Sequence, residues 1–499
     1  MRLSGIQSTR LSHHVPRRIR NILAQDADVV PNSLRKTLEA HRSSNRARLI
    51  RKIYPRTPAA GLFRPWIPPE NRASYVPSEP THPVPDESEV KKAGKKRARS
   101  SRIPETKPRK PENHLINAIR SAGESTPEQH PWVNFLAPVK VAGDAAAHLD
   151  AEIQALDRYL TPSPSEQKQI TQVCTEIRSL LEPVAPQLPQ VIGSHYTGLA
   201  LAHSDLNFLL PFEDLPRSRH NPRGPSATRP KIRDAHVSLL RQVESTLQSS
   251  PIFTDQVHWS TKGRPVLEAL HRPTGLLLRF HCGERVPAIT RYIRDYLVNN
   301  PAFRLLYTGA RALLESRGLF GSTQASITPE ALAMLIVAFL KMNHGRYPEP
   351  DHIGDQFLDL LRFYGTDINL QSVGVAVNPP GFFGAEILRL ATGEDTEPAY
   401  RRGQRSLISA KRTAAAKGNS PVDRRLCIQD PTHFMNDLGR SCTRTPELQN
   451  ALIVAHERLS RACDTWRGSE SNSSILTTAL QANFDELDRV RGRIVRPVD

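Results

Sequence analysis

Residues 191–212, VIGSHYTGLALAHSDLNFLLPF, carry the side chains best suited to phosphate chemistry. Gly193 permits close approach to the backbone, and Ser194 offers a phosphate oxygen both a hydroxyl and an amide. Asp205 and Asn207 follow in an apolar stretch that is typical of a strand. Because alternate residues of a strand share one face, both side chains are predicted to point into the same site. This stretch predicts a phosphate-binding turn beside a carboxylate.

The surrounding sequence predicts the elements that position this site. Helical spacing is found in DAAAHLDAEIQALDRYL, EQKQITQVCTEIRSLLEPV and a segment at about 230–248. Strands are predicted for QVIGS, DLNFLLP, PIFTDQVHW, RPVLEAL and GLLLRFH, and the pattern from about 287 to 345 is helical. Strands and helices followed by a helical region are typical of an α/β palm with an all-α partner, so the predicted class is α+β. The cleft between two such lobes is the usual ligand site.

Composition divides the chain into three predicted regions. Residues 1–140 are rich in Pro, Arg and Ser, and are interpreted as a disordered basic extension because repeated prolines disrupt helices. The palm with its N-terminal helices is assigned to 141–285, with order beginning near Asp144, and the helical region to 286–499. The basic stretch YRRGQRSLISAKRTAAAKGNS, at about 400–420, is interpreted as an insertion.

Five stretches resemble the non-canonical poly(A)/terminal uridylyl polymerases, within the DNA polymerase β-like nucleotidyltransferases. They are GSHYTGLALAHSDLN, HRPTGLLLRF, ARALLESRGL, IGDQFLDLLRFYGTDI and LCIQDPTHFMNDLGRS. Gly-Ser followed ten residues later by Ser-Asp is fairly specific, and the last two stretches keep the family's order and spacing. HRPTGL leading into a strand looks most similar to mitochondrial poly(A) polymerase. The resemblance implies a nucleotidyltransferase palm joined to a helical PAP-associated domain.

The resemblance also implies phosphoryl transfer by two divalent metals, held by three carboxylates. Asp205 matches the first carboxylate, whereas Asn207 and Arg279 stand at the positions of the other two. An amide is a weak ligand for a hard cation, and a guanidinium repels it, so the site is predicted to be empty of metal. If the alignment to the family were shifted, the third carboxylate position would fall on His281 or, beyond the end of the strand, on Glu284. We therefore predict an ion pair between Arg279 and Asp205.

The nucleotide pocket implied by the resemblance is altered as well. Arg311 matches a lysine that contacts the triphosphate, and arginine can still bind phosphate. The family's Ser-Tyr turn reads ITPEAL here, so Pro329 and Glu330 replace the phosphate-binding serine and the base-stacking tyrosine. Thr328 beside them is kept as a weak nucleotide-binding candidate.

Several retained residues admit both a structural and a functional interpretation. The turn at Gly193 and Ser194 is expected to serve either the fold or residual nucleotide binding. Asp430, Asn436 and Arg440 either tie the C-terminal segment to its lobe or border the base pocket.

Charge, cysteines and hydropathy limit the classes of protein. Residues 1–125 hold 26 Lys/Arg against 11 Asp/Glu, whereas the rest is near neutral, which favours a polyanion such as RNA or a solubilising or targeting tail. The five scattered cysteines argue against a zinc site and against a disulfide framework. The sequence has no apolar run long enough to predict a membrane span.

The N-terminal residues favour a mitochondrial transit peptide, within about residues 1–30, because residues 1–25 contain five arginines, three serines and no acid. KKAGKKRAR at 91–99 offers a nuclear address or an RNA-binding patch as alternatives.

Three hypotheses follow. The first is a polymerase fold that has lost catalysis and serves as an RNA-binding subunit or as a subunit of a ribonucleoprotein or mitoribosome-type assembly. RNA would be held by the basic arm and the interdomain cleft. No cofactor is then expected. The second is an active RNA 3′-nucleotidyltransferase that adds A or U with Mg²⁺ or Mn²⁺ in an atypical site, which requires a further acid such as Asp255 or Glu284 near Asp205. The third is an unrelated structural protein.

Overall fold

The computed structural model describes only part of the chain, all of it in one of the two compact units into which the chain divides. The described residues are 118–123, 128–136, 144–212, 229–253, 257–260, 265–321, 325–347, 352–389, 398–467 and 474–496. The other unit, residues 57–116, lies outside them. So do the predicted transit peptide and the basic cluster at 91–99.

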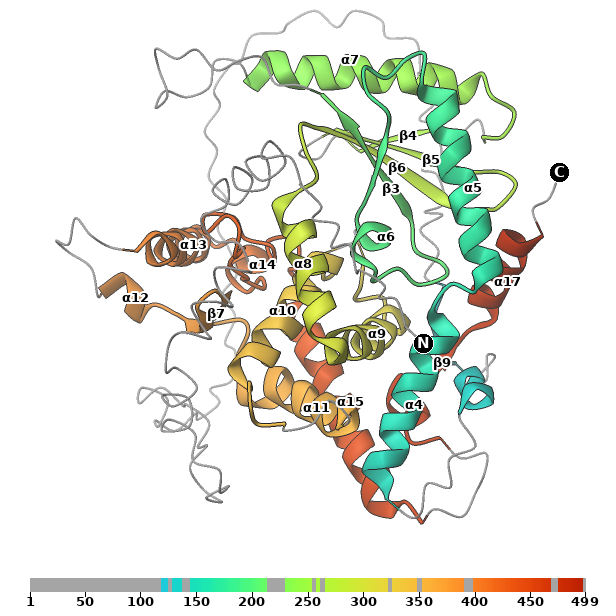
Figure 1. Ribbon diagram of the computed structural model, residues 1–499. Coiled ribbons are helices and arrows are strands. Elements are labelled where there is room, and N and C mark those ends of the chain that lie inside the picture. The colour runs from blue at the N-terminus through green and yellow to red at the C-terminus, as the bar shows by residue number, and fades with distance from the viewer. Residues whose placement is uncertain are drawn as a thin grey trace, which may run out of the picture. The chain divides into compact units, whose positions relative to one another are not determined.

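A five-stranded mixed sheet forms the base of the candidate site (Figure 1). Its order is β2 (Gln190–Ile192), β3 (Leu206–Pro211), β6 (Leu277–Gly283), β5 (Val266–Leu270) and β4 (His258–Ser260). The central pair β3 and β6 is parallel, and the other pairs are antiparallel. This agrees with the strands predicted from the apolar runs.

The sheet has one apolar and one mostly polar face because its central strands alternate. Leu206, Phe208 and Phe280 are fully buried, and the Phe208 and Phe280 rings stack at 5.5 Å between centroids. The intervening residues of β6, Arg279 and His281, are only partly buried. Helix α7 (Arg229–Gln248) packs against β5 and β6, and α5 (Pro164–Leu181) against α7.

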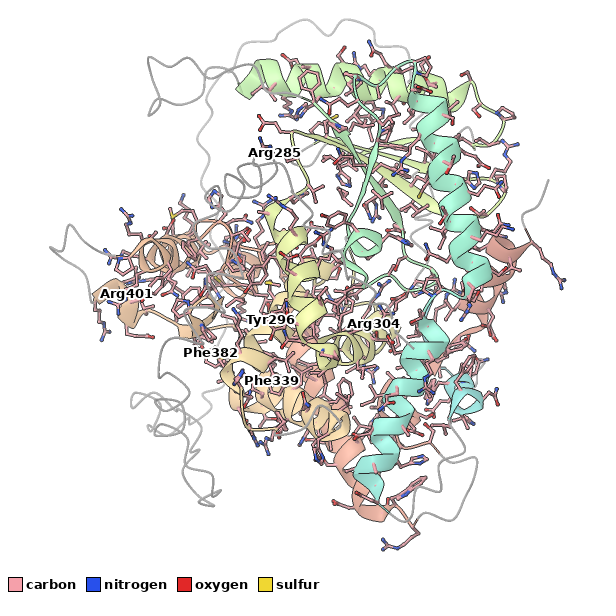
Figure 2. All side chains as sticks on the ribbon, viewed as in Figure 1. Arg285, Tyr296, Arg304, Phe339, Phe382 and Arg401 are labelled. Carbon is pink, nitrogen blue, oxygen red and sulfur yellow. The ribbon has the colours of Figure 1, made fainter. Side chains whose placement is uncertain are left out.

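Helices α4 (Ala145–Leu160) and α9 (Pro301–Ser316) pack together beside the palm. Arg304 of α9, labelled in Figure 2, joins the two parts. Its Nε lies 3.0 Å from the Asp157 carboxylate of α4, Nη2 donates to the Thr161 hydroxyl at 2.7 Å, and Nη1 donates to the Gly198 carbonyl. The partly buried Arg304 side chain therefore fixes α9 against both α4 and the turn that follows β2.

The remaining helices follow in sequence, and the predicted α+β class is confirmed. Their bounds are α6 (Ser194–Thr197), α8 (Ala288–Asn299), α10 (Pro329–Met342), α11 (Ile353–Arg362) with a π-helical turn (Phe363–Asp367), α12 (Glu386–Arg389), α13 (Ala399–Ala416), α14 (Ser420–Asp423), α15 (Thr445–Thr465), α16 (Thr477–Leu480) and α17 (Asp485–Val495). The helical part also contains a hairpin that the sequence pattern did not predict, β7 (Gly374–Val377) and β8 (Pro380–Phe383). None of the described helices is long and apolar enough to cross a membrane.

Structure begins earlier than Asp144, which corrects the predicted start of order. Strand β1 (Arg120–Ser121) pairs with β9 (Ala482–Asn483), and a short 3₁₀ helix at Pro131–Phe135 buries Trp132 completely. The Trp132 ring meets Phe484 edge-on at 5.6 Å. The partners lie about 350 residues away in sequence, so no local pattern could reveal this pairing.

The basic stretch at 400–420, interpreted as an insertion, consists mostly of the regular helix α13, residues 399–416. One side of α13 is buried, including Leu407 and Ile408, so this segment packs on the body of the helical part. The many cations of the other side concealed its amphipathic pattern.

Candidate functional site

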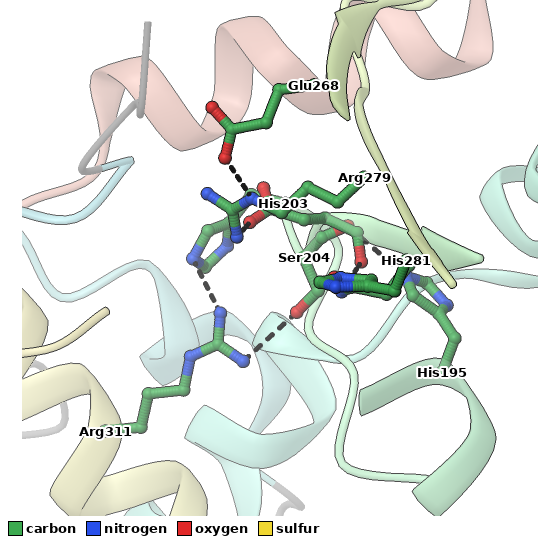
Figure 3. Close-up of polar contacts among 9 residues, drawn as sticks. His195, His203, Ser204, Glu268, Arg279, His281 and Arg311 are labelled. Atoms are coloured by element: carbon green, nitrogen blue, oxygen red, sulfur yellow. Dashed lines mark hydrogen bonds and ion pairs between the residues drawn. The ribbon is translucent and has the colours of Figure 1, made fainter. Parts of the chain in front are cut away.

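A row of three side chains crosses the polar face of the sheet. In the strand register, Asn207 of β3 lies opposite Arg279 of β6, and Arg279 lies opposite Glu268 of β5. Asp205 directly precedes β3, two residues before Asn207. Parallel pairing of the two central strands therefore brings the predicted site residues together (Figure 3).

The guanidinium of Arg279 lies between two carboxylates. Nη1 donates to Asp205, and Nε donates to Glu268 at 2.8 Å (Figure 3). The Arg279 side chain is 13% exposed, and the two carboxylates are about one quarter exposed. The predicted ion pair between Arg279 and Asp205 is thus confirmed. Burial raises the pKa of Asp205, and the positive charge of Arg279 opposes that shift.

Glu268 was missed by the sequence argument. It occupies the third position of the strand VLEAL, where its neighbours Leu267 and Ala269 are buried on the other face. The sequence therefore showed the alternation along this strand. It did not show that the strand pairs with β6. Glu268 adds a second acid, yet its carboxylate accepts a hydrogen bond from Arg279 Nε at 2.8 Å.

His281 and Asn207 contact each other on the same face. His281 Nε2 lies 3.2 Å from Asn207 Oδ1, and the Asn207 amide nitrogen donates to the Asp205 carbonyl at 3.4 Å. Glu284 lies beyond the end of β6 and is exposed. Asp255, the other acid considered as an additional ligand, lies outside the described residues.

The Gly-Ser turn, residues 193 and 194, packs closely against Asn207 of β3. Gly193 has φ +71°, and a Cβ there would lie 3.2 Å from Asn207 Nδ2, so both conformation and space require glycine. Ser194 is the first residue of α6. His195 Nε2 lies 3.2 Å from the Ser204 carbonyl, and burial lowers the pKa of this histidine. These contacts give the Gly-Ser turn a structural role in the fold.

Arg311 reaches the loop before β3 from helix α9 (Figure 3). Its Nη1 donates to the Ser204 hydroxyl at 3.1 Å, and its Nε lies 3.4 Å from Glu315. Glu315 also lies 2.7 Å from His203 Nε2. Burial alone would raise the pKa of Glu315, but His203 and Arg311 together hold it below its ordinary value. Arg311 is 6% exposed and bound within the chain, so it does not present a free guanidinium to a triphosphate.

The other predicted nucleotide-binding positions have structural contacts. The Thr328 hydroxyl caps α10 by accepting from the Ala331 amide at 3.2 Å, and Pro329 and Glu330 form the first turn of that helix. Further along, Asn436 Nδ2 donates to Asp430 Oδ2 at 2.9 Å within one loop. Arg440 is exposed.

The described residues do not fit a two-metal centre. No group of three or more His, Cys, Asp or Glu side chains among them is arranged to hold a metal ion. Asp205 and Glu268 are separated by the guanidinium of Arg279, a permanent cation at the place a divalent ion would need.

A pocket of about 360 Å³ lies beside the Gly-Ser turn, but Asp205, Asn207 and Arg279 do not line it. Its walls come from α5 and the turn, including Ile170 and Val191. The residues at the three carboxylate positions therefore do not line this pocket.

Removing the Arg279 guanidinium is expected to destabilise the protein and to make its stability depend more on pH. In Arg279→Leu, the partly buried Asp205 and Glu268 lose the guanidinium between them. The free energy of unfolding should fall by about 2 kcal/mol, which is less than for a fully buried ion pair because both carboxylates are partly exposed. The pKa of Asp205 is already raised in the folded protein, and it should rise further without Arg279. A carboxyl group whose pKa is raised by folding lowers the free energy of unfolding as the pH rises through that folded pKa. The deficit should therefore grow between pH 4 and pH 7 in urea titrations.

The matched control for that variant is Arg279→Lys. It keeps the charge but not the planar fork of donors, so it should lose less stability and show a weaker pH dependence. A Leu variant with the same deficit at both pH values would show that packing, not charge, holds Arg279 in place.

Comparison with known proteins places this geometry in a known fold. No family model matches the chain. Poly(A) RNA polymerase cid14 of Schizosaccharomyces pombe is 24% identical over 333 residues, which cover 64% of this chain and 41% of that protein. The chain thus spans less than half the length of this curated relative.

Two solved structures share the architecture. The polymerase core of TRAMP, a RNA surveillance complex, aligns over 70% of this chain and 99% of its own with a TM-score of 0.53 and 18% identity. mtPAP in complex with ATPγS aligns over 71% and 76%, with a TM-score of 0.51 and 14% identity. The chain therefore has a nucleotidyltransferase-like fold. Its resemblance to the non-canonical poly(A)/uridylyl polymerases, predicted from five sequence stretches, is confirmed.

Proposed function

We propose that this protein is a poly(A)/uridylyl polymerase-like protein that binds RNA and has lost nucleotidyl transfer. The observation that carries the proposal is the guanidinium of Arg279 between Asp205 and Glu268. The two acids and the arginine leave a formal charge of only −1 where two divalent cations would have to be held. Coulomb repulsion between Arg279 and a divalent ion about 4 Å away amounts to several kcal/mol, even at an effective dielectric of about 20.

The nucleotide-binding side supports the same proposal. Arg311 is bound to Glu315 and Ser204, and Thr328 caps a helix. Glu330 replaces a base-stacking ring with a negative charge that repels a triphosphate. Binding of ATP or UTP should therefore be weak.

RNA is the proposed ligand, held by the basic N-terminal extension and by the cleft between palm and helical domain. We further propose that the protein works within a ribonucleoprotein, in mitochondria or alternatively in the nucleus. The excess of Lys and Arg in residues 1–125 and the arginines of residues 1–25 support these proposals. The helical part is proposed to correspond to a PAP-associated domain.

The alternative is an active RNA 3′-nucleotidyltransferase with an atypical metal site. Glu268 favours this alternative, because it brings a second carboxylate to the same face as Asp205. Activity would require the Arg279 side chain to leave both acids.

An extension assay separates the two functions. The full-length protein is incubated with a short RNA, each NTP in turn, and Mg²⁺ or Mn²⁺, beside Asp205→Ala. We expect no extension, together with a shifted RNA band in a binding assay for both proteins. Extension that Asp205→Ala abolishes would overturn the proposed loss of catalysis, and failure to shift RNA would overturn the proposed RNA binding.

A further inference from the structure

Helix α13 presents a concentrated positive charge on its outer side. Residues 399–416 contain four arginines, one lysine and no acidic residue. Arg401, Arg402 and Arg412 are exposed, as is Lys417 at the C-terminal end of the helix. We call these four residues the α13 basic surface. Figure 2 labels Arg401 on this helix, away from the five-stranded sheet.

The opposite side of α13 is anchored to the helical part. Leu407 and Ile408 pack in a buried cluster with Phe383 of β8. Lys411 is only 6% exposed and donates to the backbone carbonyls of Gln371 and Arg425, both at 2.8 Å. Lys411 therefore holds α13 in place, whereas the exposed cations of the helix point away from the body of the helical part.

Close backbone contact fixes the N-terminal half of α13. A Cβ on Gly403 would lie 2.2 Å from the Phe434 carbonyl oxygen, so only glycine permits this approach. Beside it, the Gln404 amide donates to Gln429 Oε1 at 3.2 Å. The exposed arginines are therefore carried by a helix whose position is fixed, which lowers the entropic cost of binding through them.

Two of the exposed arginines are aligned along α13, and none of the three carries an ion pair with a described acid. Among the residues that the structure describes, no Asp or Glu forms a salt bridge with Arg401, Arg402 or Arg412. Arg401 and Arg412 lie about three helical turns apart on nearly the same side, a separation of about 16 Å along the axis. Such a row matches a chain of phosphates better than a single small anion.

We propose that the α13 basic surface binds the phosphate backbone of RNA. This inference rests on the proposed RNA-binding function and names a surface for it outside the N-terminal extension and the site around Arg279. The exposed residues between Arg402 and Arg412 are small, namely Ser406, Ser409 and Ala410. The helix therefore lacks the large apolar anchors typical of membrane-bound helices and of protein interfaces.

The test compares two triple variants of the full-length protein that lose the same charge. The first is Arg401→Gln/Arg402→Gln/Arg412→Gln. The control replaces three exposed cations of α5 and α7, as Lys168→Gln/Arg233→Gln/Arg241→Gln. Binding of a labelled single-stranded RNA is measured at several salt concentrations, with circular dichroism to verify folding.

The α13 variant should bind RNA about tenfold more weakly or worse at 0.1 M salt, and its salt slope should fall by about 2, since each contact contributes about 0.7. The control variant should stay close to the unmodified protein. Conversely, replacing Glu394, Asp395 and Glu397, which directly precede α13 in the sequence, by their amides should tighten binding.

Each other outcome has a distinct meaning. Equal weakening in both triple variants would show a net-charge effect and overturn the proposed surface. An α13 variant that binds like the unmodified protein would also overturn it while leaving the proposed function intact, and would direct attention to an acidic protein partner. An unmodified protein that does not bind RNA would overturn the proposed function itself.

Discussion

Replacing Asn207 and Arg279 together by aspartate is expected to create a Mn²⁺ site at least about 100-fold tighter than any in the unmodified protein. The change removes a fixed cation and adds two carboxylates to the row that already holds Asp205 and Glu268. A 100-fold gain corresponds to about 2.7 kcal/mol, which is modest beside the Coulomb terms involved. Calorimetric titration or the loss of the free Mn²⁺ resonance signal would measure it.

The single variant Asn207→Asp is the matched control. It adds one carboxylate but keeps Arg279, whose guanidinium still bridges Asp205 and Glu268. We therefore expect little Mn²⁺ binding by the single variant. If the unmodified protein already binds Mn²⁺ as tightly as the double variant, Arg279 does not block the site and the proposed loss of the metal centre is wrong.

Restored metal binding need not restore catalysis. The nucleotide pocket would still lack the stacking tyrosine implied by the resemblance, and Arg311 would still be bound to Glu315. We expect the double variant to bind metal without extending RNA. This outcome would separate the effect of the metal ligands from the effect of the nucleotide contacts.

Trp132→Ala is expected to lower the free energy of unfolding by about 3–5 kcal/mol, the usual cost of truncating a fully buried aromatic ring. The ring is wholly buried and packs edge-on against Phe484, which in turn packs against Tyr159 at 5.7 Å. Its loss leaves a cavity between segments near the two ends of the described chain. Chemical denaturation followed by circular dichroism measures the change without relying on the removed fluorophore.

Phe135→Ala supplies the comparison in the same 3₁₀ helix. Phe135 is 45% exposed and meets Tyr159 at 5.9 Å, so its removal should cost about 1 kcal/mol. Equal effects of the two variants would show that Trp132 is not part of the core. Deleting residues 1–117 instead should leave the unfolding transition nearly unchanged, because the contacts of Trp132 are retained.

The sequence by itself determined the strands and helices that hold the candidate site. Alternation along each strand indicated that Asn207 and Arg279 occupy polar positions, and the apolar runs indicated which segments form strands. The resemblance to the non-canonical poly(A)/uridylyl polymerases then brought Asp205, Asn207 and Arg279 into one site, and their chemistry there predicted an ion pair in place of a metal site. The strand pattern itself is local, because it depends on residue type and on the geometry of one strand at a time.

Tertiary structure alone decided which distant segments meet. Glu268 joins the site because β5 pairs with β6, and Arg311 is held within the chain because α9 places Glu315 beside His203. The ordered segment around Trp132 depends on β9, far along the chain. Such pairings rest on long-range burial and register, which leave no short periodic signal in the sequence.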